Sequence, residues 1–284
     1  MVYAVEWSWL TSTALFFGGL AGGSYLWAFG AGLSNERKYA NFSKVGYSIA
    51  FPAVLVYLIF LVLELGTPTN FIKIRNLTSM IFVGASIVSL FFIFSLLTLI
   101  GREPTILPQI SFNQKTQRIL EGIGSIFAFG IIMYTALLLG ASFGRPFWGS
   151  PFLPYLFLVS GLLTGWAVIS LVLLSREDWR KPVPDFLDLF VLLITLLFVL
   201  SVLDLATVVA PESIAALITG NLNVFFIVGV LIVGIFIPFI LAYYSMSKKE
   251  VPYFISGITF ILVLIGGFLL RYVIVVGGQV PPVI

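Results

Sequence analysis

Residues 8–32 read SWLTSTALFFGGLAGGSYLWAFGAG and contain no charged side chain. A helix needs about 20 mostly apolar residues to cross the hydrocarbon core of a membrane, so this stretch is long enough to span it. Its glycines recur at four-residue spacing, from Gly18 to Gly22 and from Gly19 to Gly23, which is typical of closely packed membrane helices. The stretch therefore predicts a transmembrane helix in close contact with neighbours. The alternative is a glycine-rich surface beside a flat ligand.

The rest of the chain has the same character. Hydrophobic residues make up 60% of the 284 residues and charged residues only 10%, whereas a soluble domain carries about 25% charge. Further apolar stretches of spanning length lie near 44–65, 78–100, 118–140, 150–174, 185–208, 222–246 and 252–276. We predict an all-α integral membrane protein: one transmembrane domain over residues 1–284, folded as a bundle of eight transmembrane helices.

The basic residues predict the orientation of this bundle in the cell membrane. Most of the 15 lysines and arginines fall in the loops after the first, third, fifth and seventh predicted helices. Cytoplasmic loops carry an excess of such residues, so we expect both termini to be extracytoplasmic. We expect no cleavable signal peptide, because Glu6 stands where a basic segment would precede one. The net charge of +3 is too small to indicate a nucleic-acid partner.

The chain contains no histidine and no cysteine. These are the usual protein ligands of haem and of iron–sulfur clusters. We therefore expect no metal, haem or iron–sulfur cluster in this chain. Any redox chemistry would use a diffusible organic molecule such as a quinone, with metal centres on a partner.

Ionisable side chains inside membrane helices are costly and mark functional sites. With the predicted orientation, several polar residues share one layer just inside the outer surface, and they are Trp7, Trp9, Ser12, Thr13, Glu64, Tyr134, Asp204 and Arg271. An arginine and two carboxylates there could pair, with Asp204 as the expected partner of Arg271. A tyrosine hydroxyl and a nearby carboxylate would meet the polar needs of a quinone headgroup. The alternatives are an ion-pair network that only orients helices, and tryptophans that only anchor the interface.

A second acidic set is predicted near the inner surface. Glu121 is expected to begin the fourth helix, and Asp185 and Asp188 the sixth. The helix macrodipole favours acids at these positions, which explains them without a function. The alternative is the mouth of a proton path toward Glu64 and Tyr134, which Thr195 and Ser201 could line.

Four segments resemble the polysulfide reductase NrfD family. They are WSWLTSTALFFGGLAGGSYL at 7–26, LELGTP at 63–68, YTALLLGASFGRPFWGSPFLPYLFLVSGLLTG at 134–165 and GGFLLRYVIVVGGQ at 266–279. Taken in order, they extend the similarity over nearly the whole chain. Thr67 stands where an arginine is common in the family.

The resemblance implies a quinone-binding membrane subunit without a metal cofactor. Such a subunit docks an extracytoplasmic ferredoxin-like iron–sulfur subunit, which in turn contacts a catalytic subunit, often a molybdopterin enzyme that reduces a sulfur compound. The family's tyrosine in the fourth helix corresponds to Tyr134, and the acid of its second-helix motif to Glu64. Some members use a histidine of the first helix at the quinone. This chain has none, so Trp9, Ser12 and Thr13 are the candidates to replace it.

The resulting hypothesis is a respiratory subunit that oxidises a menaquinol-type quinol near the outer surface. Protons would leave through Tyr134 and Glu64, while Arg271 would bind at the quinone and set the local field. Glu121, Asp188 and Asp204 would form a charge network or proton path. Basic residues of the outer loops, which are Lys73, Arg75 and Arg145, would dock an acidic iron–sulfur protein.

Two other classes of function stay open. A secondary transporter or proton channel would also place charges inside helices, although the sequence contains no inverted repeat. A passive membrane anchor without a working quinone site would fit the missing histidine.

Overall fold

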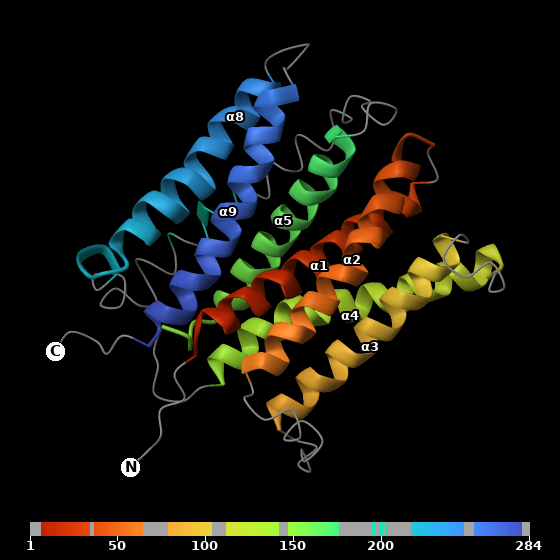
Figure 1. Ribbon diagram of the computed structural model, residues 1–284, viewed down its shortest axis with the longest axis horizontal. Coiled ribbons are helices and arrows are strands. Elements are labelled where there is room, and N and C mark those ends of the chain that lie inside the picture. The colour runs from red at the N-terminus through yellow and green to blue at the C-terminus, as the bar shows by residue number, and fades with distance from the viewer. Residues whose placement is uncertain are drawn as a thin grey trace.

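The computed structural model describes residues 7–34, 37–64, 79–103, 112–141, 147–175, 195–196, 199–200, 203, 217–246 and 253–279. Every long element in this part of the chain is a helix, and it contains no strand (Figure 1). The helices are α1 (Trp9–Leu33), α2 (Arg37–Glu64), α3 (Met80–Arg102), α4 (Gln114–Gly140), α5 (Leu153–Ser175), η4 (Val224–Phe236), α8 (Ile237–Met246) and α9 (Tyr253–Gly277).

Seven of the described helical segments are long and apolar enough to cross a membrane, with η4 and α8 joined in one span, Val224–Ser245. The chain is therefore an all-helical, multi-pass membrane protein, as predicted. The stretch predicted as a helix at 185–208 lies outside the described residues, apart from short pieces at 195–196, 199–200 and 203.

Two helices begin earlier than the apolar pattern predicts. We expected starts near 44 and 118, whereas α2 begins at Arg37 and α4 at Gln114. Their first turns are polar, so a search for apolar stretches misses them. At α4 the Asn113 side chain accepts a hydrogen bond from the amide of Thr116 at 2.7 Å and caps the helix.

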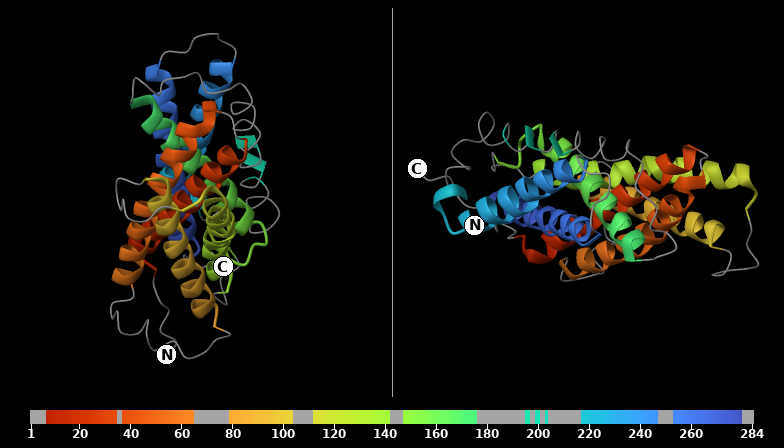
Figure 2. Two further views of the ribbon diagram at one scale, coloured as in Figure 1. Left: turned by 90° about the vertical axis from the view of Figure 1, so that its right-hand side faces the viewer. Right: turned by 90° about the horizontal axis from the view of Figure 1, so that it is seen from above.

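Helix α1 is the centre of the bundle. It contacts α2, α4, α5 and α9, while α3 and the η4–α8 span lie at opposite edges (Figures 1 and 2). Glycines allow the closest of these contacts, since a Cβ atom at Gly23 would overlap the carbonyl of Gly161, and one at Gly165 would overlap the backbone of Gly23. The interpretation of the four-residue glycine spacing as close helix packing is confirmed at these positions.

The last two spans form a second close pair. A Cβ atom at Gly234 of η4 would lie 2.6 Å from the Cα atom of Gly266 in α9. The π-helical turns of η4 give way to α-helix at Ile237, directly before Pro238. Proline has no amide hydrogen to donate, so a change of helical geometry beside it is expected.

Candidate functional site

A half-buried carboxylate closes one end of the bundle, which we call the Glu64 end. Glu64 Oε1 accepts a hydrogen bond from the amide of Ser8 at 3.0 Å, and Oε2 accepts one from its hydroxyl at 2.7 Å. Ser8 is also the N-cap of α1, since its Oγ accepts from the amide of Leu10 at 3.0 Å. The carboxylate therefore lies at the positive end of the α1 macrodipole, where negative charge is stabilised. Ser8 is not among the predicted site residues, although a serine before an apolar helix is a recognisable cap.

The same end joins the first and last helices. Gln279 accepts a hydrogen bond from the amide of Trp7 and donates one to its carbonyl, both at 2.8 Å. The ring of Trp7 lies 5.7 Å from that of Trp148, whose indole nitrogen donates to the carbonyl of Ile274 at 2.8 Å. These contacts hold Trp7 and the end of α9 together.

Tyr134 lies between helices, 6% exposed, with its ring against Gly84 of α3. A Cβ atom at Gly84 would overlap that ring, so the glycine makes the space for the phenol. Among the described residues no group forms a hydrogen bond with the Tyr134 hydroxyl. The hydroxyl is not among the fully buried polar atoms, so it is accessible to a ligand or to water.

Tyr57 of α2 is a second buried phenol. It is 2% exposed. A Cβ atom at Gly18 of α1 would lie 3.2 Å from its ring. Sequence analysis did not single out Tyr57. The available signal was its position seven residues before Glu64, which places both on one face of α2.

The three α1 residues proposed to replace a histidine lie in different surroundings. Trp9 is 59% exposed and points away from the core, next to the ring of Phe60 at 6.2 Å. The Thr13 hydroxyl donates to the carbonyl of Trp9 at 2.9 Å. Ser12 is fully buried, and its hydroxyl has no hydrogen-bond partner in the described part of the chain. The neighbouring Thr11 hydroxyl is near the Glu64 carboxylate but makes no well-formed hydrogen bond there.

Arg271 is 0% exposed and ties three helices together. Its Nε donates to the carbonyl of Leu15 in α1 at 3.0 Å, and Nη1 donates to Ser160 Oγ in α5 at 2.8 Å and to the carbonyl of Gly267 at 3.0 Å. Nη2 lies against Gly19 and has no acceptor among the described residues. Phe157 covers the guanidinium at 5.3 Å.

Within the described residues, Glu64 and Arg271 of the predicted polar layer contact different groups. Glu64 bonds to Ser8 and forms no ion pair with Arg271, contrary to the expected arginine–carboxylate network. The Arg271 side chain contacts α1 at Gly19. The Tyr57 ring contacts α1 at Gly18, which lies on a different face of that helix. Asp204 lies outside the described residues, as do Lys73, Arg75 and Arg145 of the predicted docking loops.

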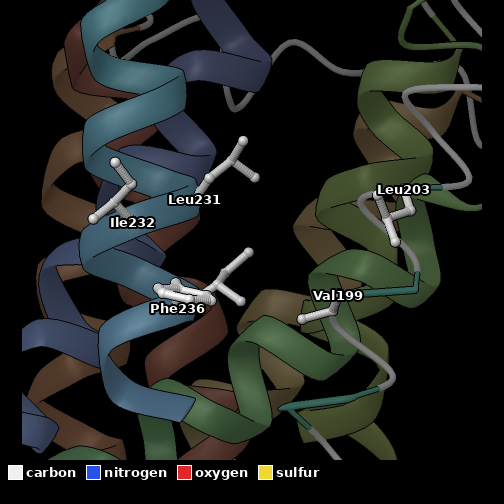
Figure 3. Close-up of a pocket in the computed structure, with 6 residues that line it drawn as sticks. Val199, Leu203, Leu231, Ile232 and Phe236 are labelled. Atoms are coloured by element: carbon white, nitrogen blue, oxygen red, sulfur yellow. The ribbon is translucent and has the colours of Figure 1, made fainter. Parts of the chain in front are cut away.

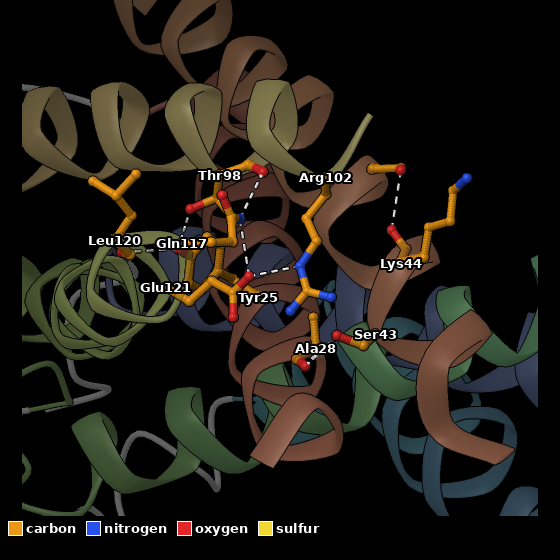
Figure 4. A network of polar contacts seen from close by, with 10 residues as sticks. Tyr25, Ala28, Ser43, Lys44, Thr98, Arg102, Gln117, Leu120 and Glu121 are labelled. Atoms are coloured by element: carbon orange, nitrogen blue, oxygen red, sulfur yellow. Dashed lines mark hydrogen bonds and ion pairs between the residues drawn. The ribbon is translucent and has the colours of Figure 1, made fainter. Parts of the chain in front are cut away.

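A second polar cluster occupies the opposite end of the bundle, which we call the Glu121 end (Figure 4). Glu121 Oε1 pairs with Arg102 Nε at 2.6 Å and accepts a hydrogen bond from Gln117 Nε2 at 2.9 Å. The Tyr25 hydroxyl lies 2.8 Å from that of Thr98. Glu121 was expected to begin its helix, but α4 begins at Gln114, so this buried carboxylate lies two turns inside. For Glu121 the macrodipole explanation is therefore wrong, and the ion pair with Arg102 replaces it.

The prediction of an inner acidic set and that of a proton path through the sixth helix both involve residues outside the described part of the chain. Asp185, Asp188 and Ser201 lie outside it, whereas Thr195 is described and buried. Of the cluster at the Glu121 end, sequence analysis identified only Glu121. The other members come from α1, α3 and α4, and only the packing of these helices brings them together.

An apolar pocket of about 300 Å³ lies between η4 and the short pieces at 199–200 and 203 (Figure 3). Its lining residues are Val199, Leu203, Leu231, Ile232, Ile235 and Phe236. This lining offers no hydrogen-bond donor, so the pocket suits hydrocarbon and not a polar headgroup. Within the described ranges no group of three or more acidic, histidine or cysteine residues is placed to hold a metal ion.

Comparison with known proteins gives a consistent result. The model of the family "Polysulphide reductase, NrfD" matches residues 1–282. The sequence is 28% identical over 309 residues to the C subunit of the polysulfide reductase of Wolinella succinogenes, and the match covers 97% of this protein and 95% of that one. It is 27% identical over 256 residues to protein NrfD of Escherichia coli, covering 80% and 79%, and 26% identical over 305 residues to an NrfD homolog of Haemophilus influenzae, covering 96% and 94%.

Proposed function

Because the chain belongs to the polysulphide reductase NrfD family, we propose that it is the quinone-binding membrane subunit of a respiratory oxidoreductase complex. It would pass electrons from a menaquinol-type quinol to a ferredoxin-like iron–sulfur subunit on the extracytoplasmic side. That subunit would serve a molybdopterin enzyme acting on a sulfur compound. The observation that carries the proposal is Tyr134, a phenol 6% exposed between the helices whose hydroxyl makes no hydrogen bond to a described residue and is accessible.

The proposal includes one transmembrane domain over residues 1–284, an eighth span and both termini outside the cell. The directions of the described helices support the extra span. Helix α5 ends at Ser175, at the Glu121 end, whereas Leu217 contacts Gly277 at the Glu64 end. A further span between residues 176 and 216 would connect these two ends. The apolar stretch at 185–208 is long enough to do so.

In the proposed site the chain supplies groups that hold the headgroup and accept its protons. Oxidation of the quinol removes two electrons and two protons, and the electrons go to the iron–sulfur cluster of the partner. The Tyr134 hydroxyl can both donate and accept a hydrogen bond at the headgroup. Glu64, at the end of the bundle, is the carboxylate that would release protons to the outside.

Arg271 would act on the proposed site through its charge. It is fully buried, and its free Nη2 group is a donor without a described acceptor. In a medium of low dielectric constant its field extends further than in water. Ser12 and Thr13 of α1 complete the proposed site. The Ser12 hydroxyl is the better candidate to bind the headgroup, because it has no described hydrogen-bond partner, whereas the Thr13 hydroxyl already donates to the carbonyl of Trp9. The exposed Trp9 suits the membrane interface rather than the headgroup.

Docking to the partner is proposed for the loops at the Glu64 end. The basic residues Lys73, Arg75 and Arg145 belong to these loops by sequence. Basic side chains would attract an acidic iron–sulfur protein and speed its association. Isolation of the native complex and identification of its subunits tests this part directly. A chain that purifies alone, or with a visible haem band of its own, would contradict it.

The same preparation separates the rival functions. Vesicles containing this chain without any redox partner should show no flux of solutes or ions. Flux in such vesicles would support a transporter or channel. A complex that assembles normally but binds no quinol would identify a passive anchor.

We expect the Glu64→Gln substitution to slow quinol oxidation roughly 10-fold to 100-fold without changing the quinol KM. The amide can still accept from Ser8 but cannot carry a proton at neutral pH. The measurement is steady-state quinol oxidation by the purified complex. The matched control is Ser8→Ala, which removes the cap at a cost of about 1 kcal/mol but keeps the carboxylate. Loss of assembly alone in Glu64→Gln, with normal turnover of the assembled fraction, would leave Glu64 a structural role.

A further inference from the structure

Glu64 is the last residue of α2, where the macrodipole of its own helix disfavours a negative charge. The last turn of α2 contains no basic side chain that would offset this effect. The carboxylate also lies at the beginning of α1, whose macrodipole favours a negative charge there. Because the two helix ends act on this charge in opposite directions, the local hydrogen bonds decide how readily Glu64 is ionised.

Both hydrogen bonds of the Glu64 carboxylate come from one residue, Ser8. Its amide donates to Oε1 at 3.0 Å, and its hydroxyl donates to Oε2 at 2.7 Å. The Ser8 hydroxyl oxygen already accepts from the amide of Leu10 at 3.0 Å, so its single proton is directed to the carboxylate. A hydrogen bond to an ionised oxygen is stronger than one to a neutral carboxyl group, so both donors favour the charged form of Glu64.

The described helices around Glu64 supply no counter-ion to it. Helices α1, α3 and α5 pack against α2. Of these, α1 and α5 contain no charged side chain, and the charged residue of α3, Arg102, lies at the Glu121 end. Their tyrosines are Tyr25, also at the Glu121 end, and Tyr155, which is exposed. The nearest titratable residue of α2 itself is Tyr57, two turns before Glu64.

We infer that Ser8 is a positioning residue that holds Glu64 ionised at neutral pH and so ready to accept a proton. The inference rests on the proposed function, in which Glu64 releases the quinol protons to the outside. Each carboxylate oxygen keeps a second lone pair that Ser8 does not use, so a proton can bind there. The two hydrogen bonds also make the carboxylate a weaker base, so the proton is passed on and the ionised form returns. Ser8 gains and loses no proton and touches no substrate.

The first test measures quinol oxidation by the purified complex as a function of pH, with each variant normalised to its own alkaline plateau. Proton acceptance requires ionised Glu64, so turnover falls as the pH drops through the titration of this carboxylate. Ser8→Ala removes one donor to the charged form, and we expect the midpoint of the fall to move up by about one pH unit. Ser8→Thr, which keeps the hydroxyl, should restore the midpoint.

Ser8→Asp separates this role from helix capping. Aspartate caps a helix as well as serine does, but at neutral pH it has no side-chain proton to donate and adds a second negative charge. We expect it to move the midpoint at least as far as Ser8→Ala does. Ser79→Ala is the matched control, because Ser79 caps α3 through the amide of Ile81 at 3.3 Å and has no described hydrogen bond to a carboxylate. It should leave the midpoint unchanged.

Infrared difference spectroscopy of the same complex follows the Glu64 carboxyl group without turnover. The band of the protonated carboxyl group that is missing in Glu64→Gln belongs to Glu64, and its titration should move upward in Ser8→Ala and Ser8→Asp. An unmoved band in both variants, or a wild-type titration in Ser8→Asp alone, would overturn the inference. A band that moves while the pH dependence of turnover does not would support the inference and count against proton release through Glu64.

Discussion

Replacement of Tyr134 by phenylalanine is expected to slow quinol oxidation by about 100-fold or more while the complex still assembles. The substitution removes one oxygen atom and keeps the ring that fills the space beside Gly84. The hydroxyl has no described hydrogen-bond partner, so its loss breaks no hydrogen bond that holds the helices. We therefore expect Tyr134→Phe to lower turnover and to leave the thermal stability of the complex nearly unchanged.

The measurement compares kcat, KM and the thermal unfolding of the purified complex. Gly84→Ala is an informative second variant, because its added methyl group would displace the Tyr134 ring without altering any polar group. We expect it to lower turnover as well, together with some stability. A Tyr134→Phe complex with unchanged turnover would remove Tyr134 from the mechanism, whatever Gly84→Ala does.

The course of the helices is predictable from the sequence because burial in lipid demands long apolar stretches. Helices α1 and α9 begin and end within about a residue of the prediction, whereas the polar first turns of α2 and α4 escape it. Such stretches are defined along the chain, and lipid imposes the same length on each. No knowledge of neighbouring helices is needed to find them.

The site is less predictable because it depends on which helix faces meet. Tyr57 looks like one more aromatic residue of an apolar helix until α1 is packed against it. Arg102 and Gln117 become partners of Glu121 only when α3 lies beside α4. Conversely, Glu64 and Arg271 share a predicted depth but contact different groups. Depth follows from sequence, whereas the direction in which a side chain points does not.

Arg271→Met is expected to leave the bundle at least as stable, yet to slow quinol oxidation roughly 100-fold. A fully buried guanidinium carries a desolvation cost of several kcal/mol, which an ion pair can offset. The described partners of Arg271 are two carbonyls and one serine, none of them charged. Methionine has a similar length and no charge to desolvate, so the substitution removes this cost along with three hydrogen bonds.

Comparison with Arg271→Lys and with a double variant decides what the charge does. Lysine keeps the positive charge but lacks the forked guanidinium that bonds to Leu15, Ser160 and Gly267. Partial activity of Arg271→Lys with a lower thermal stability would show that the charge serves catalysis and that the guanidinium hydrogen bonds serve helix packing. If Asp204 is the counter-ion, Arg271→Met alone leaves a buried carboxylate unpaired, and it should lose stability that Asp204→Asn then restores. Normal turnover in Arg271→Met would show that the charge serves neither the quinol nor its protons. A stable but slow Arg271→Met complex would show that the arginine is retained for function, because the uncharged bundle holds together without it.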